Sequence, residues 1–418
     1  MVEQRNWAGN YTYSTSNWHF PEKIDQVQQL VANSKHLKVV GSRHSFNGIA
    51  DSSHMMISLQ HLSKILQLDH ERKLVTVEAG VKYSDLCLYL AHEGYALKNL
   101  ASLPHISVAG ACATATHGSG NDNSCLATAV YEMDVITADG DLVSFSRERN
   151  HEEFNGVVVN LGGLGVVTRL SLEIVPAFEI QQFVYENLPL IKYKEHFNDI
   201  YSSAYSVSSF TDWRNETMNQ VWLKHYVTDD QPIKMEPTFF GAPLATKNLH
   251  PVGLGAENCT EQQGVSGPWY DRLPHFRMGF TPSAGEELQS EYMVPRERGY
   301  EALCALNEIR NQIAPALLIS EIRTIAKDDL WMSPFYKQDS VGFHFTWQRD
   351  WALVRTILPI IEKQLAPFNP RPHWGKLFTM PPKDVQSRYE KLNDFQQLLH
   401  HYDPKGKFRN SFIESYLL

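Results

Sequence analysis

Hydrophobic side chains recur at helical spacing in three segments of the chain. Residues 21–34 place apolar side chains three or four positions apart from Ile24 onward, and Pro21 suits the first turn of a helix. The same spacing occurs at 82–97 and at 299–314. These segments are predicted to form amphipathic helices.

Apolar and polar positions alternate in other segments, which indicates strands. This pattern covers 55–62, 73–81 and 165–176. Residues 131–146 hold two such runs joined by Asp139-Gly140, a dipeptide typical of tight hairpin turns. The short helices and strands up to residue 176 indicate an α+β fold.

The texture of the sequence changes after Pro176. Aromatic residues and prolines become frequent, and the runs between strand-like segments become longer. At 418 residues, the chain is also too long for one ordinary core. We therefore predict a second domain that begins close to residue 177.

Composition and charge exclude several classes of protein. A net charge of -9 provides no basic footprint for nucleic acid, and no apolar run is long enough for a membrane span. The five cysteines lack CxxC spacing, and the N-terminus lacks a secretory signal, so a cytoplasmic protein with reduced thiols is expected. The histidines in LLHHYD (398–403) lack partners at ligand spacing, so we expect a solvated helix end and no metal.

Residues 101–120 (ASLPHISVAGACATATHGSG) consist mostly of Ala, Gly, Ser and Thr. Such a stretch lets the backbone approach a ligand closely, and its N–H groups can cradle a phosphate. A flexible linker is the alternative, but Leu103, Ile106 and Val108 would anchor this segment in a core. The segment does not have the GxGxxG spacing, and we predict no helix after it. A Rossmann nicotinamide site is therefore disfavoured.

A second loop candidate is GSRHS at 41–45, which follows the apolar pair Val39 and Val40. The pattern predicts a strand that ends in a tight loop carrying His44. An isolated loop histidine is usually a solvated surface group. The local pattern alone leaves open whether His44 is such a group or a functional one.

Polar side chains also interrupt three apolar segments near the C-terminus. Strand alternation would place Glu321 and Arg323 on one face of their segment, and likewise His344 and Thr346. If the segments are neighbouring strands, these residues would point into one pocket together with the residues of the third segment. A pocket for a polar ligand and a structural ion-pair network remain open as interpretations, because both would compensate inward charges. The pairs are Glu321 with Arg323, His344 with Thr346, and His373 with Lys376.

Many motifs follow one another along the chain between residues 6 and 408. They are HSFNGIADS, ASLPHISVAG, THGSG, LGVVT, YSVSSFTDWR, CTEQQGVSGPW, ELQSEYMVPRE, EIRT and RPHWGK. Through these ordered motifs the sequence resembles the alditol (xylitol) oxidases of the vanillyl-alcohol-oxidase class of FAD enzymes, which have a PCMH-type FAD-binding fold.

This resemblance implies an α+β architecture in three parts. Residues 1–176 would form a two-subdomain PCMH-type FAD-binding domain. Residues 177–372 would form an α+β cap domain built on an antiparallel sheet, which covers the substrate. Residues 373–418 would return to the FAD-binding domain.

The resemblance also implies that His44 is joined covalently to the 8α-methyl of the flavin. A neutral imidazole is a competent nucleophile for such a bond. The family often has glycine where this chain has Arg43, so the Arg43 side chain is expected either to add a positive field or to face outward. The other residues expected at FAD are Gly41, Ser42, Ser45, Ser102, Ser107, Gly110, Thr114, Ala115, Thr116, His117, Gly118, Val166, Val167 and His373.

The implied reaction is oxidation of the terminal alcohol of an alditol such as xylitol or sorbitol to the aldose. Hydride passes to flavin N5, and oxygen is reduced to hydrogen peroxide. Arg323 and Lys376 would stabilise the negative charge on the reacting oxygen, with Lys376 as the base and His344 as the alternative base. Ser102, Glu321 and Thr346 would bind the other hydroxyls.

Two alternative functions remain at this stage. One is an aldonolactone oxidoreductase of the same superfamily that uses an acceptor other than oxygen, since Ala101 is expected near the flavin edge where oxygen approaches. The other is a polyol-binding protein without flavin. The expected partners are a polyol and oxygen, without nucleic acid or membrane, and the chain is expected to be a monomer.

Overall fold

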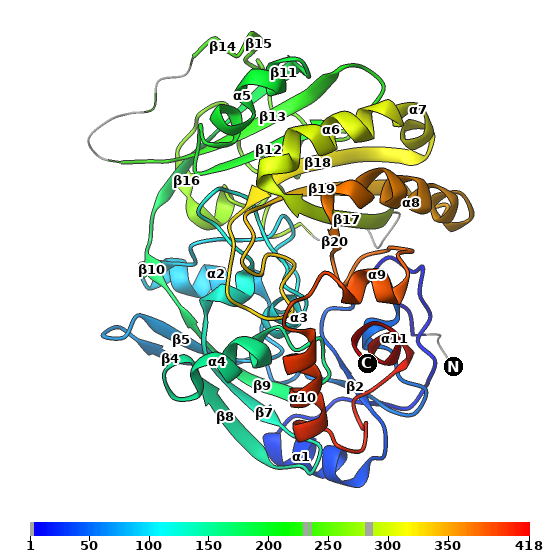
Figure 1. The fold of residues 1–418 in the computed structure, drawn as a ribbon. Coiled ribbons are helices and arrows are strands. Elements are labelled where there is room, and N and C mark those ends of the chain that lie inside the picture. Colours follow the sequence, from blue (N-terminus) through cyan, green and yellow to red (C-terminus); the bar gives the residue numbers. More distant parts are fainter. Residues whose placement is uncertain (1–3, 229–232, 234–235, 281–286) are drawn as a thin grey trace.

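Two antiparallel sheets, one on each side of residue 176, organise the chain in a computed structural model (Figure 1). The structure describes residues 4–228, 233, 236–280 and 287–418. In this part of the chain, the N-terminal sheet has the order β4-β5-β9-β7-β8. Its strands are β4 (Ile65–Asp69), β5 (Leu74–Glu78), β7 (Val130–Ile136), β8 (Leu142–Ser146) and β9 (Val166–Glu173).

A smaller parallel sheet lies in the same half and carries the loop of His44. Its order is β1-β3-β2, with β1 (Trp18–His19), β3 (Met56–Ser58) and β2 (Lys38–Val40). The backbone N–H of Leu37 donates to the carbonyl of Lys407 at 3.0 Å, so the C-terminal segment borders this sheet. The helices of this half are α1 (Ile24–Asn33), α2 (Tyr83–His92), α3 (Val108–Ala113), α4 (Arg147–Val158), α9 (Pro382–Gln386), α10 (Leu392–Tyr402) and α11 (Ser411–Leu417).

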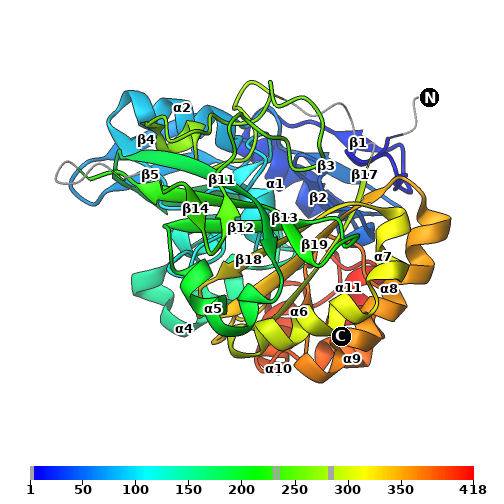
Figure 2. The same ribbon diagram turned by 90° about the horizontal axis from the view of Figure 1, so that it is seen from above.

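The second sheet has the order β16-β11-β13-β12-β18-β19-β17-β20 among the described residues. Helices α5 (Lys192–Tyr201), α6 (Gly299–Glu308), α7 (Arg310–Ile313) and α8 (Trp351–Leu365) accompany it (Figures 1 and 2). Its main strands are β11 (Glu179–Pro189), β12 (Ser206–Thr211), β13 (Thr217–Tyr226), β17 (Glu287–Pro295), β18 (Leu317–Ile325) and β19 (Ser340–Gln348), with the short β16 (Gly267–Pro268) and β20 (Arg371–Pro372) at its edges.

Strand alternation divides the second sheet into an apolar face and a polar face. Ile322, Phe343 and Phe345 are buried in the main hydrophobic core. Their strand neighbours on the other face are polar, and much of that face borders a cavity. A long segment, 244–280, packs against the outer part of the polar face, where Phe276 joins the apolar cluster of Phe210.

Most of the predicted elements are present. The hairpin at 131–146 is confirmed as β7 and β8, with Gly140 at φ +90° in the turn. The helix predicted at 21–34 begins later, at Ile24, because the Gln26 side chain accepts the Glu22 and Lys23 N–H groups ahead of it.

Other predictions need correction. The helical spacing at 299–314 forms two helices, α6 and α7, because Ile309 has a non-helical backbone between them. A helix, α3, forms inside the small-residue stretch where none was expected. His400 and His401 are exposed in the last turn of α10, as predicted for a solvated helix end. Within the described ranges, no helix is both long enough and apolar enough to cross a bilayer.

Candidate functional site

A cavity of about 630 Å³ lies between the two halves of the chain. One side is formed by the loops at 39–46 and 101–117, and the other by the polar face of the second sheet. The segment 373–376, which follows β20, closes it near Lys376. The cavity is therefore shaped by segments that are distant in the sequence.

Most of the residues predicted from the sequence line this one cavity. They are Gly41, Ser42, Arg43, His44, Ser45, Ser102, Ser107, Gly110, Thr114, Thr116, His117, Glu321, Arg323, His344, Thr346, His373 and Lys376.

Four predicted cofactor residues are not part of the lining. Ala115 is fully buried, and a Cβ at Gly118 would lie 2.3 Å from the Leu100 carbonyl oxygen, so both face protein. Val166 packs in an apolar cluster with Val27. Val167 lies next to it on β9. Contact of these four residues with a cofactor stays a prediction.

The two small-residue loops pack directly against each other. The N–H of Ser42 donates to Ser107 Oγ at 3.3 Å, and the N–H of Ser107 donates to Ser42 Oγ at 3.2 Å. A Cβ on Gly41 would lie 2.2 Å from Ser107 Oγ, so any side chain at position 41 would push the loops apart. The small residues thus allow the close approach that forms this end of the cavity.

His44 is held as a neutral imidazole in this loop. Its Nδ1 lies 3.1 Å from the Ser42 carbonyl oxygen, which can only accept, so Nδ1 carries a proton. Its Nε2 lies 2.7 Å from Nε2 of His105, and Trp7 stacks on the ring at 4.8 Å between centroids. Burial, with smaller effects from His105, lowers the pKa of His44 to about 3. The ring therefore keeps a lone pair at neutral pH.

Arg43 borders the cavity, but its guanidinium contacts the N-terminal segment. Its side chain is exposed and donates to Gln4 Oε1 at 3.2 Å. The backbone has φ of 62°, a conformation that favours glycine. This backbone conformation explains why glycine suits position 43. An outward orientation of the Arg43 side chain is one of the two possibilities that the sequence left open.

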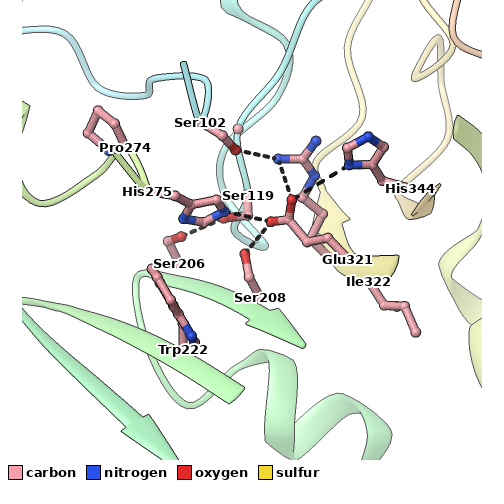
Figure 3. Close-up of polar contacts among 12 residues, drawn as sticks. Ser102, Ser119, Ser206, Ser208, Trp222, Pro274, His275, Glu321, Ile322 and His344 are labelled. Carbon is pink, nitrogen blue, oxygen red and sulfur yellow. Dashed lines mark hydrogen bonds and ion pairs between the residues drawn. The ribbon is translucent and has the colours of Figure 1, made fainter. Parts of the chain in front are cut away.

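The other end of the cavity is a polar row across three neighbouring strands. Glu321 on β18 is paired in register with His344 on β19, which is paired in turn with Glu291 on β17. Figure 3 shows Glu321 between His275, Ser208 and His344. Two of the three segments suspected from the sequence are therefore neighbouring strands, and the third reaches the same site through Lys376, which contacts Glu291.

Arg323 and Lys376 provide the positive charge of this row. The Arg323 guanidinium lies 3.1 Å from Glu291 Oε1 and 3.5 Å from Glu321 Oε2, and its Nη1 is 3.4 Å from Ser102 Oγ. The Lys376 ammonium lies 2.6 Å from Glu291 Oε2. Burial opposes ionisation of both carboxyls, but the surrounding cations hold their pKa values well below the usual range. Both glutamates are therefore ionised.

The two candidate bases differ in their surroundings. Burial lowers the pKa of Lys376, Glu291 opposes this, and Arg323 adds to it. Burial and the nearby Lys376 lower the pKa of His344 to about 4, so His344 is neutral at pH 7. Among the described residues, His344 Nε2 is buried without a hydrogen-bond partner. Either group can accept a proton in its neutral form.

Glu291 is a central residue that the sequence analysis missed. It is fully buried, and it contacts Lys376, Arg323 and His117, whose Nε2 is 3.3 Å from Oε1. The signal was present, because Glu287, Gln289 and Glu291 alternate along one strand and so share a face. This face is polar because it borders the cavity.

Ligand atoms of His117, Glu291 and His373 lie within 4.8 Å of one another, close enough to hold a metal ion. However, Lys376 and Arg323 already neutralise Glu291. A divalent cation would have to approach two fixed positive charges, so the charges of this cluster disfavour a metal. The absence of a metal from the protein stays a prediction.

Comparisons with known proteins now give the family. A family model described as an FAD binding domain matches residues 18–146, and one described as D-arabinono-1,4-lactone oxidase matches 285–416. The alditol oxidase of a Streptomyces species is 45% identical over 416 residues, covering 99% of this chain and 98% of the relative. The chain belongs to the alditol oxidase family.

More distant relatives agree with this result. The L-gulonolactone oxidase of Mus musculus is 26% identical and covers 99% of this chain and 98% of its own length. Cholesterol oxidase from B. sterolicum has the same fold, with a TM-score of 0.80 at 14% identity, covering 100% of this chain and 96% of that structure. The protein is a FAD-dependent oxidoreductase with an α+β FAD-binding fold, as the sequence predicted.

The lining fits FAD on its own chemistry. At one end, two glycine- and serine-rich loops leave room for backbone approach, and a neutral imidazole adjoins them. At the other end, the Arg323 Nε and the His344 Nε2 lack hydrogen-bond partners within the described part of the chain. Buried polar atoms of this kind call for a polar ligand.

Proposed function

We propose that this protein oxidises the terminal primary alcohol of an alditol to the aldose and reduces oxygen to hydrogen peroxide. The observation that carries the proposal is the polar row of Glu321, His344 and Glu291, with Arg323 and Lys376 among them. A polyol presents a row of hydroxyls, and this wall offers both donors and acceptors to it. The identity to an alditol oxidase supports the same substrate class.

FAD, when bound, accepts the hydride and delivers the electrons to oxygen. The Ser42 and Ser107 loops would hold it, together with Thr114, Thr116 and His373. Because the Gly41 loop packs against Ser107 without room for a side chain, the position of this wall is determined by packing. Tight packing keeps a cofactor site preorganised.

The alcohol must lose a proton as the hydride leaves, so negative charge grows on its oxygen. Arg323 is fixed in place by Glu291, and its preorganised charge stabilises a developing alkoxide, as does Lys376 once it has taken up the proton. Lys376 in its neutral form is the proposed proton acceptor at Nζ. His344, through its unpartnered Nε2, is the alternative acceptor.

The remaining hydroxyls would bind Ser102, Thr346 and Glu321. Glu321 is an ionised acceptor, and charge-assisted hydrogen bonds to it are stronger than neutral ones. An aldonolactone lacks the free hydroxyl that its ring closure consumes, so it would use this row less well. The polar row therefore favours an alditol over the lactone of the distant relatives.

We further propose a reducing, cytoplasmic setting, a monomer, and domains that divide at residue 176. All five cysteines lie in the described ranges and are free, which supports a reducing compartment. The two large sheets lie on opposite sides of residue 176, which supports the division into 1–176 and 177–372. Contacts of Lys407 with Val31 and Ala138 support the return of 373–418 to the first domain.

The purified protein is expected to form hydrogen peroxide with xylitol or sorbitol, one molecule for each oxygen consumed. Turnover of L-gulono-1,4-lactone under the same conditions is expected to be much slower. An oxygen electrode together with a peroxidase-coupled assay measures both quantities. Turnover that needs an artificial dye as acceptor, or that prefers the lactone, would instead favour an aldonolactone oxidoreductase. A protein without bound flavin and without turnover would favour a polyol-binding protein.

His44 is proposed to carry the flavin through a covalent bond to its 8α-methyl. A neutral ring, ordered by Ser42, His105 and Trp7, supports this role. Acid precipitation of the wild-type protein is expected to leave yellow flavin on the pellet. His44→Ala is expected to release all of its flavin to the supernatant. His54→Ala, a change at an exposed histidine outside the lining, serves as the control and should retain the flavin.

A further inference from the structure

Glu321 lies at one end of a buried polar chain whose middle member, His275, also borders the cavity and whose other end, Lys224, does not. His275 Nε2 lies 2.9 Å from Glu321 Oε1, and Lys224 Nζ lies 3.3 Å from Nδ1 of His275. Lys224 is on β13, and His275 belongs to the long segment 244–280. The chain Lys224-His275-Glu321 thus joins three separate parts of the second half.

Glu321 determines which nitrogen of His275 carries a proton. The ionised carboxylate can only accept, so the proton of a neutral His275 resides on Nε2 and points at Oε1. Nδ1 is then an acceptor. Burial lowers the pKa of Lys224 to about 7, and its Nζ, which donates to the carbonyl oxygens of Leu273 and Pro274, lies 3.3 Å from this acceptor. Burial lowers the pKa of His275, consistent with the neutral ring.

Packing holds the His275 ring in this orientation. Phe210 lies edge-on to it with ring centroids 5.5 Å apart, and Trp222 does so at 5.2 Å. The backbone is also fixed, because the Thr260 N–H donates to the His275 carbonyl at 3.0 Å. A ring clamped on its sides and bonded at both nitrogens has one orientation available to it.

The two oxygens of Glu321 are used differently. Oε1 accepts from His275 Nε2 and from Ser208 Oγ, which is 2.7 Å away, so its two lone pairs are occupied. Oε2 faces Arg323 Nη1 at 3.5 Å and His344 Nδ1 at 3.9 Å, both longer contacts. Arg323 and His344 also border the cavity, so Oε2 is the oxygen left to accept from a ligand.

We propose that His275 and Lys224 are positioning residues that lock Glu321 through Oε1, so that Oε2 is presented to a hydroxyl of the polyol distant from the reacting carbon. This inference rests on the proposed function and deepens it. The segment 244–280 then belongs to the substrate site, since it brings His275. Specificity for a polyhydroxy substrate would depend on this segment as well as on the strands.

Variants at position 275 test the proposal through KM and kcat for xylitol. A glutamine amide reaches the place of the imidazole Nε2, whereas an asparagine amide reaches only that of Nδ1. His275→Gln is therefore expected to keep KM within threefold of the wild type. His275→Asn and His275→Phe are expected to raise KM tenfold or more while kcat changes less than threefold, as the loss of one hydrogen bond to a charged group predicts.

Lys224→Met is expected to raise KM in the same direction, because His275 Nδ1 loses the side chain that holds the ring against Glu321. His225→Gln is the matched control, since His225 neighbours Lys224 on β13 and is not part of the cavity lining, and its KM should stay at the wild-type value. The proposal would be overturned if His275→Gln and His275→Asn raised KM equally. It would also be overturned if these variants lowered kcat by the same factor by which they raise KM. A wild-type protein that turns over no alditol would instead refute the proposed function.

Discussion

Replacing Lys376 by methionine is expected to lower kcat/KM for an alditol by about 10³-fold, within the range for loss of a general base. Methionine keeps most of the apolar volume of the lysine side chain but can neither accept a proton nor stabilise an alkoxide. The loss should appear in kcat as well as in kcat/KM, because the negative charge on the substrate oxygen, with which Lys376 interacts, develops only in the transition state. Steady-state oxygen consumption across a range of xylitol concentrations measures both constants.

The pH profile identifies the role of Lys376 more directly than the rate does. A base must be neutral to accept a proton, so kcat/KM of the wild type is expected to rise with pH through the pKa of Lys376. Burial and Arg323 hold that pKa below the usual value for lysine. The rise should disappear in Lys376→Met.

Two variants serve as comparisons for this experiment. Lys407→Met removes an ammonium that donates to the carbonyls of Val31 and Ala138 outside the cavity lining, so it should leave the pH profile unchanged. His344→Gln removes the alternative base. If His344→Gln abolishes turnover while Lys376→Met keeps activity within tenfold of the wild type, the base is His344.

Much of the fold followed from local patterns, because burial of one face imposes a period on each element. Residues 73–81 and 165–176 alternate since one side of β5 and of β9 is buried in the core. Helix α4 was missed because its N-terminal half is polar, and Ser146, which accepts from the Arg149 N–H, is the main local signal for its start. The break between α6 and α7 has no glycine or proline at it, so tertiary packing must decide it.

The candidate site was predictable where charged residues interrupt apolar strands. Glu321 with Arg323 and His344 with Thr346 stood out because strand alternation brings each pair to one face. His275 could not be found in this way, because it lies in a long segment without periodicity. Its relation to Glu321 depends on how the segment 244–280 crosses the sheet, which local sequence does not determine.

Glu291→Gln is expected to have the second large effect, and on two separate properties. Glutamine has nearly the shape of glutamate but no charge, so Lys376 and Arg323 would lose a buried partner at 2.6 Å and 3.1 Å. Removing one partner of a buried ion pair typically destabilises a protein by about 3–5 kcal/mol. Thermal unfolding followed by far-UV circular dichroism at pH 7 measures this loss.

The stability effect has a predictable dependence on pH. The pKa of Glu291 in the folded chain is well below that of a free carboxyl, so its contribution is fully present above about pH 5 and is lost as the pH falls through the folded pKa. The difference in stability between wild type and Glu291→Gln should therefore shrink on acidification. A difference that stays constant down to pH 3 would contradict an ionised Glu291 in the folded protein.

Glu291→Gln is also expected to shift the pH dependence of kcat/KM, which a simple loss of activity would not do. Glu291 raises the pKa of Lys376, so its removal should shift the rising limb of kcat/KM to lower pH by about 1–3 units, the usual effect of an opposite charge at this distance. Glu362→Gln is the matched control, because Glu362 is a buried carboxyl on α8 that accepts from the Tyr292 hydroxyl outside the cavity. Glu362→Gln should lower stability without moving the limb. A limb that stays in place in Glu291→Gln would mean that Lys376 is not the group that titrates, and the proton would then pass to His344.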